Sequence, residues 1–234
     1  TRQAIMREID GTLSRLGTDY LDLYIIHRFD YDTPIEETME ALHDLVKAGK
    51  VRALGASAMY GYQFYNMQLA ARDNGWTPFS AMENHYNLLY REDERELLPI
   101  CKQMKVSLMP YSPLAAGHLA RPQWKSESLR GTTDRVAMGK YDKTEAEDMQ
   151  IVKRVAELAE KYNCKMSQIA IAWQWAKGIL SPIIGATKTQ YLDDSAGAFD
   201  IKLTAEDLAY LEEPYVPHEI VGAIDKNPAQ GVIL

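Results

Sequence analysis

The amino-acid sequence predicts an α/β fold, namely part of a (β/α)8 barrel around a parallel sheet. Short apolar runs typical of strands begin at residues 21, 51, 79 and 106, and amphipathic segments separate them. These starts lie 30, 28 and 27 residues apart, the length of one βα unit. No GxGxxG pattern follows the first strand, so a barrel is favoured over a doubly wound sheet. Five strands are recognisable where a barrel needs eight, so we expect about three further βα units, roughly 85 residues, before the first residue.

The first elements follow from periodicity and capping signals. Residues 1–16 carry an apolar residue every three or four positions, which predicts a helix, and Gly17 is suited to its C-cap. Residues 21–27 form a mostly apolar run typical of a strand buried on both faces. The segment from Thr33 to Glu36 predicts a capping box with a proline at the first helical position, and the helix ends near Gly49.

The strand and helix alternation then continues to the end of the chain. A polar stretch over residues 117–144 interrupts it and is expected as a long loop. We expect a single partial barrel domain over 1–234, with a cofactor or substrate loop at 115–145 and a C-terminal tail at 214–234. The remaining predicted elements are strands at 51–57, 79–84, 106–111 and 180–185, and helices at 62–74, 92–104, 145–162, 167–176, 190–199 and 204–213.

Composition excludes several classes of protein. The 234 residues include 33 acidic and 26 basic side chains, a net charge of -7, which argues against nucleic-acid partners and anionic membrane surfaces. No apolar run approaches the 18 or so residues that a transmembrane helix needs. Cys101 and Cys164 have no metal-ligand spacing and are too few for a disulfide framework, so we expect no metal and a cytoplasmic location. The chain begins with Thr1, so the native N-terminus is expected to lie upstream.

Candidate functional residues stand where the predicted strands end, which is where barrel enzymes carry their chemistry. His27 suits a general acid–base role or a hydrogen bond to a carbonyl, and a packed structural histidine is the alternative. Ser57 suits a ligand contact or an N-cap, and Asn84 an amide partner or a turn. Tyr111 suits stacking on a planar ring, with core packing as the competing interpretation.

The segment around Gly185 predicts a phosphate site. A glycine allows close approach of a ligand, Thr187 and Lys188 add a hydroxyl and a cation, and a helix N-terminus follows. Barrels commonly bind phosphate between the loops after their seventh and eighth strands. A solvated basic turn is the alternative. The loop after the fourth recognisable strand contributes further polar groups, namely Ser112, Arg121, Lys125 and Arg130.

These residues and their motifs resemble the aldo-keto reductase superfamily over essentially the whole length of the sequence. The motifs are most similar to those of the microbial branch with aryl-alcohol dehydrogenase-like and versiconal hemiacetal acetate reductase-like enzymes. The segments that carry the resemblance are 16–27 (LGTDYLDLYIIH), 55–57 (GAS), 84–96 (NHYNLLYREDERE), 111–114 (YSPL), 184–187 (IGAT), 194–195 (DS) and 211–218 (LEEPYVPH).

The resemblance implies an NADP(H)-dependent reductase that passes a hydride to an aldehyde or ketone while a tyrosine delivers the proton. His27 falls on the family's catalytic histidine. The implied cofactor contacts are Ser57 and Glu83 at the nicotinamide carboxamide, Tyr111 under its ring, Ser112, Leu114 and Arg130 at the pyrophosphate, and Gly185, Thr187, Lys188, Tyr191, Asp194 and Ser195 at the adenosine and 2′-phosphate end.

The sequence also departs from the family pattern. Ala58 replaces an Asn or Arg, Glu83 replaces a Gln, and Tyr191 replaces a Gln or Arg. An ionised Glu83 accepts hydrogen bonds and donates none. The family's catalytic Asp, Tyr and Lys are expected in the upstream units, so residues 1–234 alone are expected to be inactive.

Two other functions compete with the reductase. One is a catalytically silent NADP(H)-binding module that regulates a partner, resembling the β subunits of potassium channels. The other is an unrelated phosphate-binding barrel such as an aldolase or isomerase, and the lack of a lysine at the end of any recognisable strand weighs against its Schiff-base version. The expected ligands are the cofactor and a small carbonyl substrate, and an oligomer is compatible with the sequence.

Overall fold

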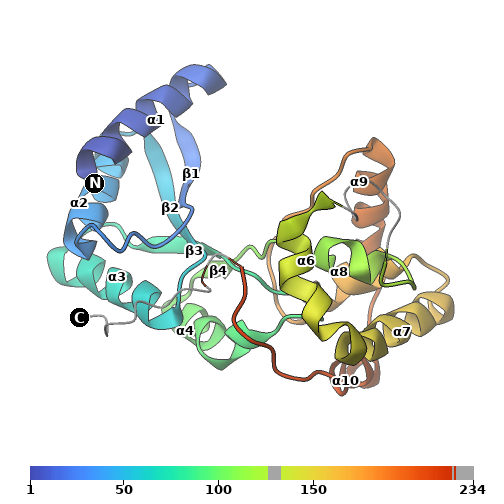
Figure 1. Ribbon diagram of the computed structural model, residues 1–234. Helices are drawn as coiled ribbons and strands as arrows, with labels where there is room; N and C mark the ends of the chain where they lie inside the picture. The colour runs from blue at the N-terminus through green and yellow to red at the C-terminus, as the bar shows by residue number, and fades with distance from the viewer. Residues whose placement is uncertain (126–132, 223, 225–234) are drawn as a thin grey trace. The chain divides into compact units, whose positions relative to one another are not determined.

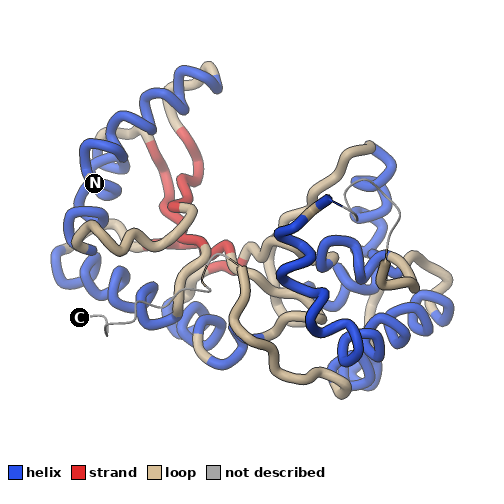
Figure 2. Tube along the Cα trace, in the orientation of Figure 1, coloured by secondary structure: helices blue, strands red, loops and turns tan. Residues whose placement is uncertain are grey.

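The computed structural model describes residues 1–125, 133–222 and 224, and it has an α/β fold with a parallel sheet (Figure 1). The strands, which are red in Figure 2, follow the order β1-β2-β3-β4 in the described part of the chain, and every neighbouring pair is parallel. Their bounds are β1 (Leu21–Ile26), β2 (Val51–Ser57), β3 (Phe79–Glu83) and β4 (Ser107–Leu108). No helix in these residues has both the length and the apolarity needed to cross a membrane.

The chain forms two compact units. Unit 1 comprises residues 1–84 and 94–108 and contains the sheet, and unit 2 comprises residues 85–93 and the described residues from 109 onwards. The helices of unit 1 are α1 (Arg2–Leu16), α2 (Ile35–Lys47), α3 (Gly61–Asn74) and α4 (Leu97–Met104), and the short helix η1 (Glu92–Arg95) spans a boundary between the units.

The hydrophobic core of unit 1 lies between its helices and one face of the sheet. Leu54 and Met82 from the strands are fully buried with Leu42 and Phe64 from α2 and α3. The opposite sheet face requires a glycine at position 55. A Cβ there would lie 2.9 Å from the side chain of Ile25, because the register pairs these two residues. Gly55 therefore lets large side chains on β1 lean over the centre of the sheet.

Unit 2 is helical in the residues that the structure describes. Trp173 is fully buried with Ile151, Val155, Ile169 and Leu211. Its helices are η2 (Ala115–Ala120), α6 (Arg135–Tyr141), η3 (Asp142–Thr144), α7 (Glu145–Lys161), α8 (Met166–Ala176), α9 (Thr189–Ala196), η4 (Gly197–Asp200) and α10 (Ala205–Glu212).

Two of the predicted strands need correction. Residues 180–185 form no strand, because Pro182 has no N–H and the segment contributes one backbone bond, from Ile183 N to Pro110 O (2.9 Å). The strand expected at 106–111 is shortened to β4, since Pro110 interrupts its ladder. Beyond β4, Tyr111 forms an isolated parallel bridge with His85.

The expected loop at 115–145 contains ordered helices. The helices η2, α6 and η3 lie within it, and the side chain of Asp134 caps α6 by accepting from Ala137 N (3.0 Å). Residues 126–132, with the predicted site residue Arg130, lie outside the described residues. The prediction of a capping box at Thr33 is also wrong, because Pro34 is the N-cap of α2 and makes no side-chain capping bond.

The start of the expected C-terminal tail is attached to unit 2. The Tyr215 hydroxyl donates to a Glu92 carboxylate oxygen (2.8 Å), and His218 Nε2 lies 3.0 Å from Asp148. Burial alone would lower the pKa of His218, but the hydrogen bond and the charge of Asp148, the Val216 carbonyl and the charge of Glu92 together outweigh it and raise that pKa. The LEEPYVPH motif is therefore held to the rest of unit 2 through Tyr215 and His218.

Asp207 joins α10 to the end of α7. Its carboxylate accepts hydrogen bonds from Lys161 Nζ (2.6 Å) and from the Thr204 backbone N–H (3.1 Å). Burial alone would raise the pKa of Asp207, but the hydrogen bonds from Lys161, Tyr162 and Thr204 outweigh it and lower the pKa to about 2.

Asp207→Asn is expected to lower the free energy of unfolding by about 1–2 kcal/mol at pH 7. The folded pKa lies below the ordinary 3.8, so the stabilisation is complete above that pH and is lost as the pH falls toward about 2. Urea unfolding at pH 7 and pH 2.5 tests this. The exposed Asp200→Asn is the control, and an equal loss in both variants at pH 7 contradicts the prediction.

Candidate functional site

Three predicted site residues of unit 1 gather where neighbouring parallel strands end. His27 follows β1 and is exposed, Ser57 ends β2, and Glu83 ends β3 opposite Ser57 in the register. The Ser57 hydroxyl is buried and donates to the Glu83 carbonyl oxygen (2.8 Å). The proton of Ser57 is therefore used within the protein, and the hydroxyl offers a ligand only its acceptor lone pairs.

The Glu83 carboxyl is half-buried and lies within electrostatic reach of His27. Burial raises the pKa of Glu83, and the positive charge of His27 opposes part of that rise. The pair thus offers an exposed imidazole beside a carboxyl that holds its proton to a higher pH than usual. Such a pair can donate hydrogen bonds to a carbonyl oxygen and exchange a proton with it. Asn84, the next predicted candidate, is buried.

Tyr111 in unit 2 belongs to a stack of three rings. The His85 ring lies nearly parallel to Tyr111, with centroids 5.2 Å apart, and to Tyr90, with centroids 4.2 Å apart. Lys140 Nζ lies 4.8 Å from the Tyr111 ring centroid. Tyr111 itself remains partly exposed, so neighbouring rings fix the plane of a side chain that a ligand can still reach.

Tyr141, which the sequence did not single out, connects this stack to the neighbouring backbone. Its hydroxyl lies 2.8 Å from His85 Nε2 and accepts from Asn87 Nδ2 (3.1 Å), which also donates to Ser112 O (2.9 Å). Burial raises the pKa of Tyr141, and burial with the Lys140 charge lowers that of His85, so both groups are neutral at pH 7. His85 and Asn87 lie in the quoted NHYN motif, whereas nothing in the polar stretch marked Tyr141.

The backbone beside Tyr111 is held in an uncommon conformation. Ser112 and Ala116 have positive φ angles of 58° and 55°, and Gly117 follows at 96°. Left-handed conformations cost free energy at residues other than glycine, so the surrounding structure imposes them. All three line a cavity of about 330 Å³ with Tyr111 and Gly185.

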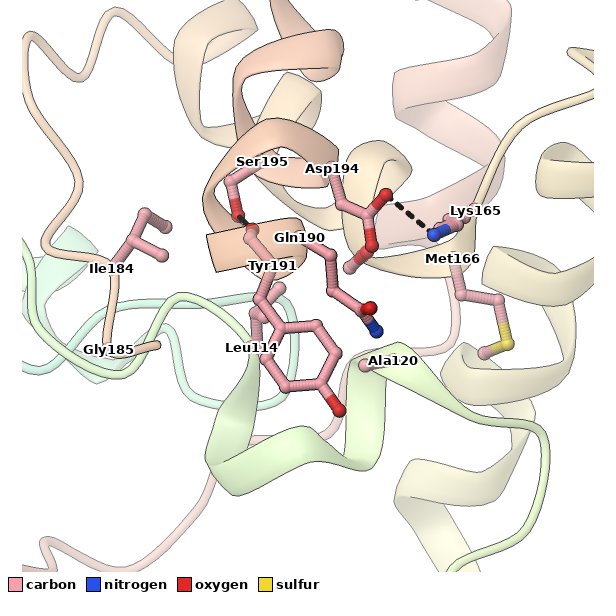
Figure 3. Close-up of a pocket in the computed structure, with 11 residues that line it drawn as sticks. Leu114, Ala120, Lys165, Met166, Ile184, Gly185, Gln190, Tyr191, Asp194 and Ser195 are labelled. Atoms are coloured by element: carbon pink, nitrogen blue, oxygen red, sulfur yellow. Dashed lines mark hydrogen bonds and ion pairs between the residues drawn. The ribbon is translucent and has the colours of Figure 1, made fainter. Parts of the chain in front are cut away.

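A second cavity, of about 450 Å³, adjoins the first because both are lined by Leu114, Ile184 and Gly185 (Figure 3). Lys165 Nζ and Asp194 Oδ1 form an ion pair (2.5 Å) at its wall, a contact between residues distant in sequence. Ser195, also at this wall, donates its hydroxyl proton to Tyr191 O (2.7 Å). The other lining residues are Ala120, Met166, Ser167 and Gln190.

The two cavities collect most of the predicted cofactor contacts of unit 2. Thr187 and Lys188 are exposed and line neither, and Lys188 Nζ lies 5.9 Å from the Tyr191 ring centroid. The sequence missed Lys165. Within the described residues, no three His, Cys, Asp or Glu side chains gather closely enough to hold a metal ion.

Comparisons with known proteins agree on one family. The model of the aldo/keto reductase family matches residues 1–215. The chain is 46% identical over 223 residues to an aldo-keto reductase of Fusarium vanettenii, covering 95% of this chain and 60% of that protein. It is 43% identical over 221 residues to the versiconal hemiacetal acetate reductase of Aspergillus parasiticus, covering 94% of this chain and 64% of that protein.

Two further comparisons give the same result. A Schizosaccharomyces pombe protein provisionally named an aryl-alcohol dehydrogenase is 44% identical over 225 residues, with 96% of this chain and 63% of that protein covered. The crystal structure of a thermostable aldo-keto reductase with the inhibitor epalrestat has a TM-score of 0.74 at 27% identity, covering 91% of this chain and 66% of that one. The chain thus spans 60–64% of the curated relatives named here.

Tyr141→Phe is expected to lower the free energy of unfolding of unit 2 by about 1–3 kcal/mol, because His85 and Asn87 each lose a buried partner. Guanidinium unfolding followed by tryptophan fluorescence measures the change. Tyr210→Phe, which removes an exposed hydroxyl bonded to Glu157, is the control and should cost less than about 0.5 kcal/mol. Equal losses would show that the Tyr141 network contributes no more than a surface contact.

Proposed function

The chain belongs to the aldo/keto reductase family, and we propose that the whole protein reduces aldehydes or ketones to alcohols with NADP(H) as the hydride donor. Residues 1–234 then supply the C-terminal part of an eight-stranded barrel, which accords with their share of the relatives' length. The cysteines Cys101 and Cys164 form no disulfide with each other, which supports a cytosolic location.

The observation that carries this proposal is the pair of adjoining cavities in unit 2. Tyr111 lines the smaller cavity, the charged pair of Lys165 and Asp194 lines the larger, and the two cavities share Leu114, Ile184 and Gly185. A Cβ at Gly185 would meet no atom within 4 Å, so a ligand can reach this backbone. These residues fit a dinucleotide with a planar ring and phosphates.

When bound, NADPH supplies the hydride that reduces the carbonyl carbon. The proposed roles of this chain's residues in unit 2 are to bind and orient: Tyr111 would support a planar ring, and Ser112 and Leu114, which line the smaller cavity, would contact the pyrophosphate. Since His85 stacks against Tyr111 and is itself stacked against Tyr90, the plane of the Tyr111 ring is fixed before any ligand binds.

His27 is proposed to donate a hydrogen bond to the substrate oxygen, which becomes more negative as the carbonyl is reduced. The imidazole is exposed beside Glu83 and thus accessible to a substrate. The family's proton-donating tyrosine matches none of the tyrosines near the strand ends of this chain, so we assign the proton donor to no residue here.

The activity is tested by following NADPH absorbance with the full-length protein and a panel of aromatic and aliphatic aldehydes. Turnover supports the reductase. Tight NADPH binding without turnover of any carbonyl would favour the silent regulatory module, and absence of NADPH binding would overturn both functions.

His27→Ala in the full-length protein is expected to lower kcat by about 10² or more while the Kd for NADPH stays nearly unchanged. His43→Ala is the matched control, because His43 bonds to Thr77 (3.0 Å) and serves structure. The control should lose thermal stability and keep its kcat. The same pattern in His27→Ala would assign His27 to packing instead.

Glu83→Gln is expected to strengthen NADPH binding by about three- to tenfold at pH 8, because a Gln both donates to and accepts from the carboxamide. In the native protein, NADPH affinity should fall as the pH rises through the elevated pKa of Glu83, since the ionised group no longer donates. The variant should lack this pH dependence. Fluorescence titrations from pH 4.5 to 8.5 measure both, with the exposed Glu147→Gln as control, and identical profiles would refute the assignment.

A further inference from the structure

We propose that Lys165 is the residue that selects NADPH over NADH, and that its ion pair with Asp194 sets how strong the preference is. The proposal rests on the function proposed above and deepens it. The sequence directed attention to Lys188 as the cation for the 2′-phosphate, whereas the structure points to a lysine 23 positions earlier in the chain.

The first argument is location. Among the residues that line the larger cavity, Lys165 is the one cation and Asp194 the one anion. Lys188 is exposed, does not line that cavity, and directs its ammonium toward the Tyr191 ring. A phosphate held in the cavity therefore meets Lys165 as its nearest positively charged wall residue.

The second argument is that the ion pair is easily exchanged. The Lys165 side chain is 62% exposed and that of Asp194 is 24% exposed, and pairs of this kind contribute little to stability. A phosphate monoester carries a charge of about −1.5 to −2 at pH 7, with three acceptor oxygens. It can replace the singly charged Asp194 carboxylate as the partner of the Lys165 ammonium at small cost to the fold.

The third argument concerns Asp194. The 2′-hydroxyl of NADH can donate to a carboxylate, which is how acidic residues commonly recognise the adenosine ribose of NADH. The 2′-phosphate of NADPH is instead repelled by it. The Lys165 ammonium therefore favours NADPH, and the Asp194 carboxylate favours NADH. The relative strength of these two interactions decides which cofactor binds more tightly.

Ser195 does not provide this discrimination. Its hydroxyl donates to the Tyr191 carbonyl oxygen (2.7 Å), so its proton is already used within α9. The remaining polar side chains at the cavity wall, those of Ser167, Gln190 and Tyr191, are neutral and do not distinguish a phosphate from a hydroxyl by charge.

The test uses the full-length protein and four nucleotides, namely NADPH, NADH and the two adenosine halves 2′,5′-ADP and 5′-AMP, titrated by calorimetry. Lys165→Ala should weaken NADPH and 2′,5′-ADP by about tenfold or more and leave NADH and 5′-AMP within about twofold. Lys165→Arg should retain the preference. Asp194→Asn should strengthen NADPH and weaken NADH.

Two further variants make the outcome specific. Lys153→Ala removes an exposed lysine of α7 that does not line the cavity, and all four affinities should stay unchanged. Lys188→Ala tests the cation that the sequence suggested. A selective loss of NADPH in Lys188→Ala but not in Lys165→Ala overturns the proposal, as does an equal loss of both cofactors in Lys165→Ala.

The outcome also separates this proposal from the proposed function. If the native protein binds neither NADPH nor NADH, the proposed function fails and this inference fails with it. If the native protein binds and uses both, and Lys165→Ala keeps the same ratio of affinities with an unchanged melting temperature, only the role of Lys165 is refuted.

Discussion

The parallel backbone ladder of unit 1 is the constraint on which its candidate site depends. Because β1, β2 and β3 run in the same direction, their carboxyl ends lie at one edge, and the residues that follow them become neighbours. The pairing of Ser57 with Glu83 is a direct result, and the electrostatic contact between Glu83 and His27 follows from the same alignment. No local sequence motif joins these residues, which lie 26 or more positions apart. A register shift of one residue would turn the Glu83 side chain to the helix-covered face.

The sequence predicted those parts of the fold that depend on apolar periodicity. The strands β1, β2 and β3 and the helices α1 and α7 are confirmed close to their expected bounds, because each buries a face that the pattern displays. The irregular segment at 180–185 was mistaken for a strand, since its composition is apolar but Pro182 prevents a continuous ladder. The helix α6 was missed because its seven residues are too few to show a period. Family membership was predictable, since it rests on motifs that remain visible in one sequence.

The candidate site was predictable only in part, for a related reason. Residues at strand ends were found because strand ends can be located. Tyr141 and Lys165 were not, because their importance comes from contacts over long separations, 56 residues for Tyr141 to His85 and 29 for Lys165 to Asp194. Where a polar side chain belongs to no periodic pattern, the sequence around it does not indicate which distant residue it contacts in the folded chain. The pocket wall in unit 2 is therefore a product of tertiary packing.

The run of positive φ angles beside Tyr111 has a consequence for the thermodynamics of binding. Ser112 and Ala116 are fixed in conformations that these residue types rarely adopt in an unfolded chain, and Asn87 holds the Ser112 carbonyl in place. The loop thus loses its conformational entropy during folding, and a ligand that enters the cavity contacts a preorganised surface. Association at this wall then loses little conformational entropy of the protein. Replacing Ala116 by glycine would relieve the backbone strain and so stabilise the fold. The more flexible loop would then lose conformational entropy when a ligand binds, so the affinity for the ligand would fall.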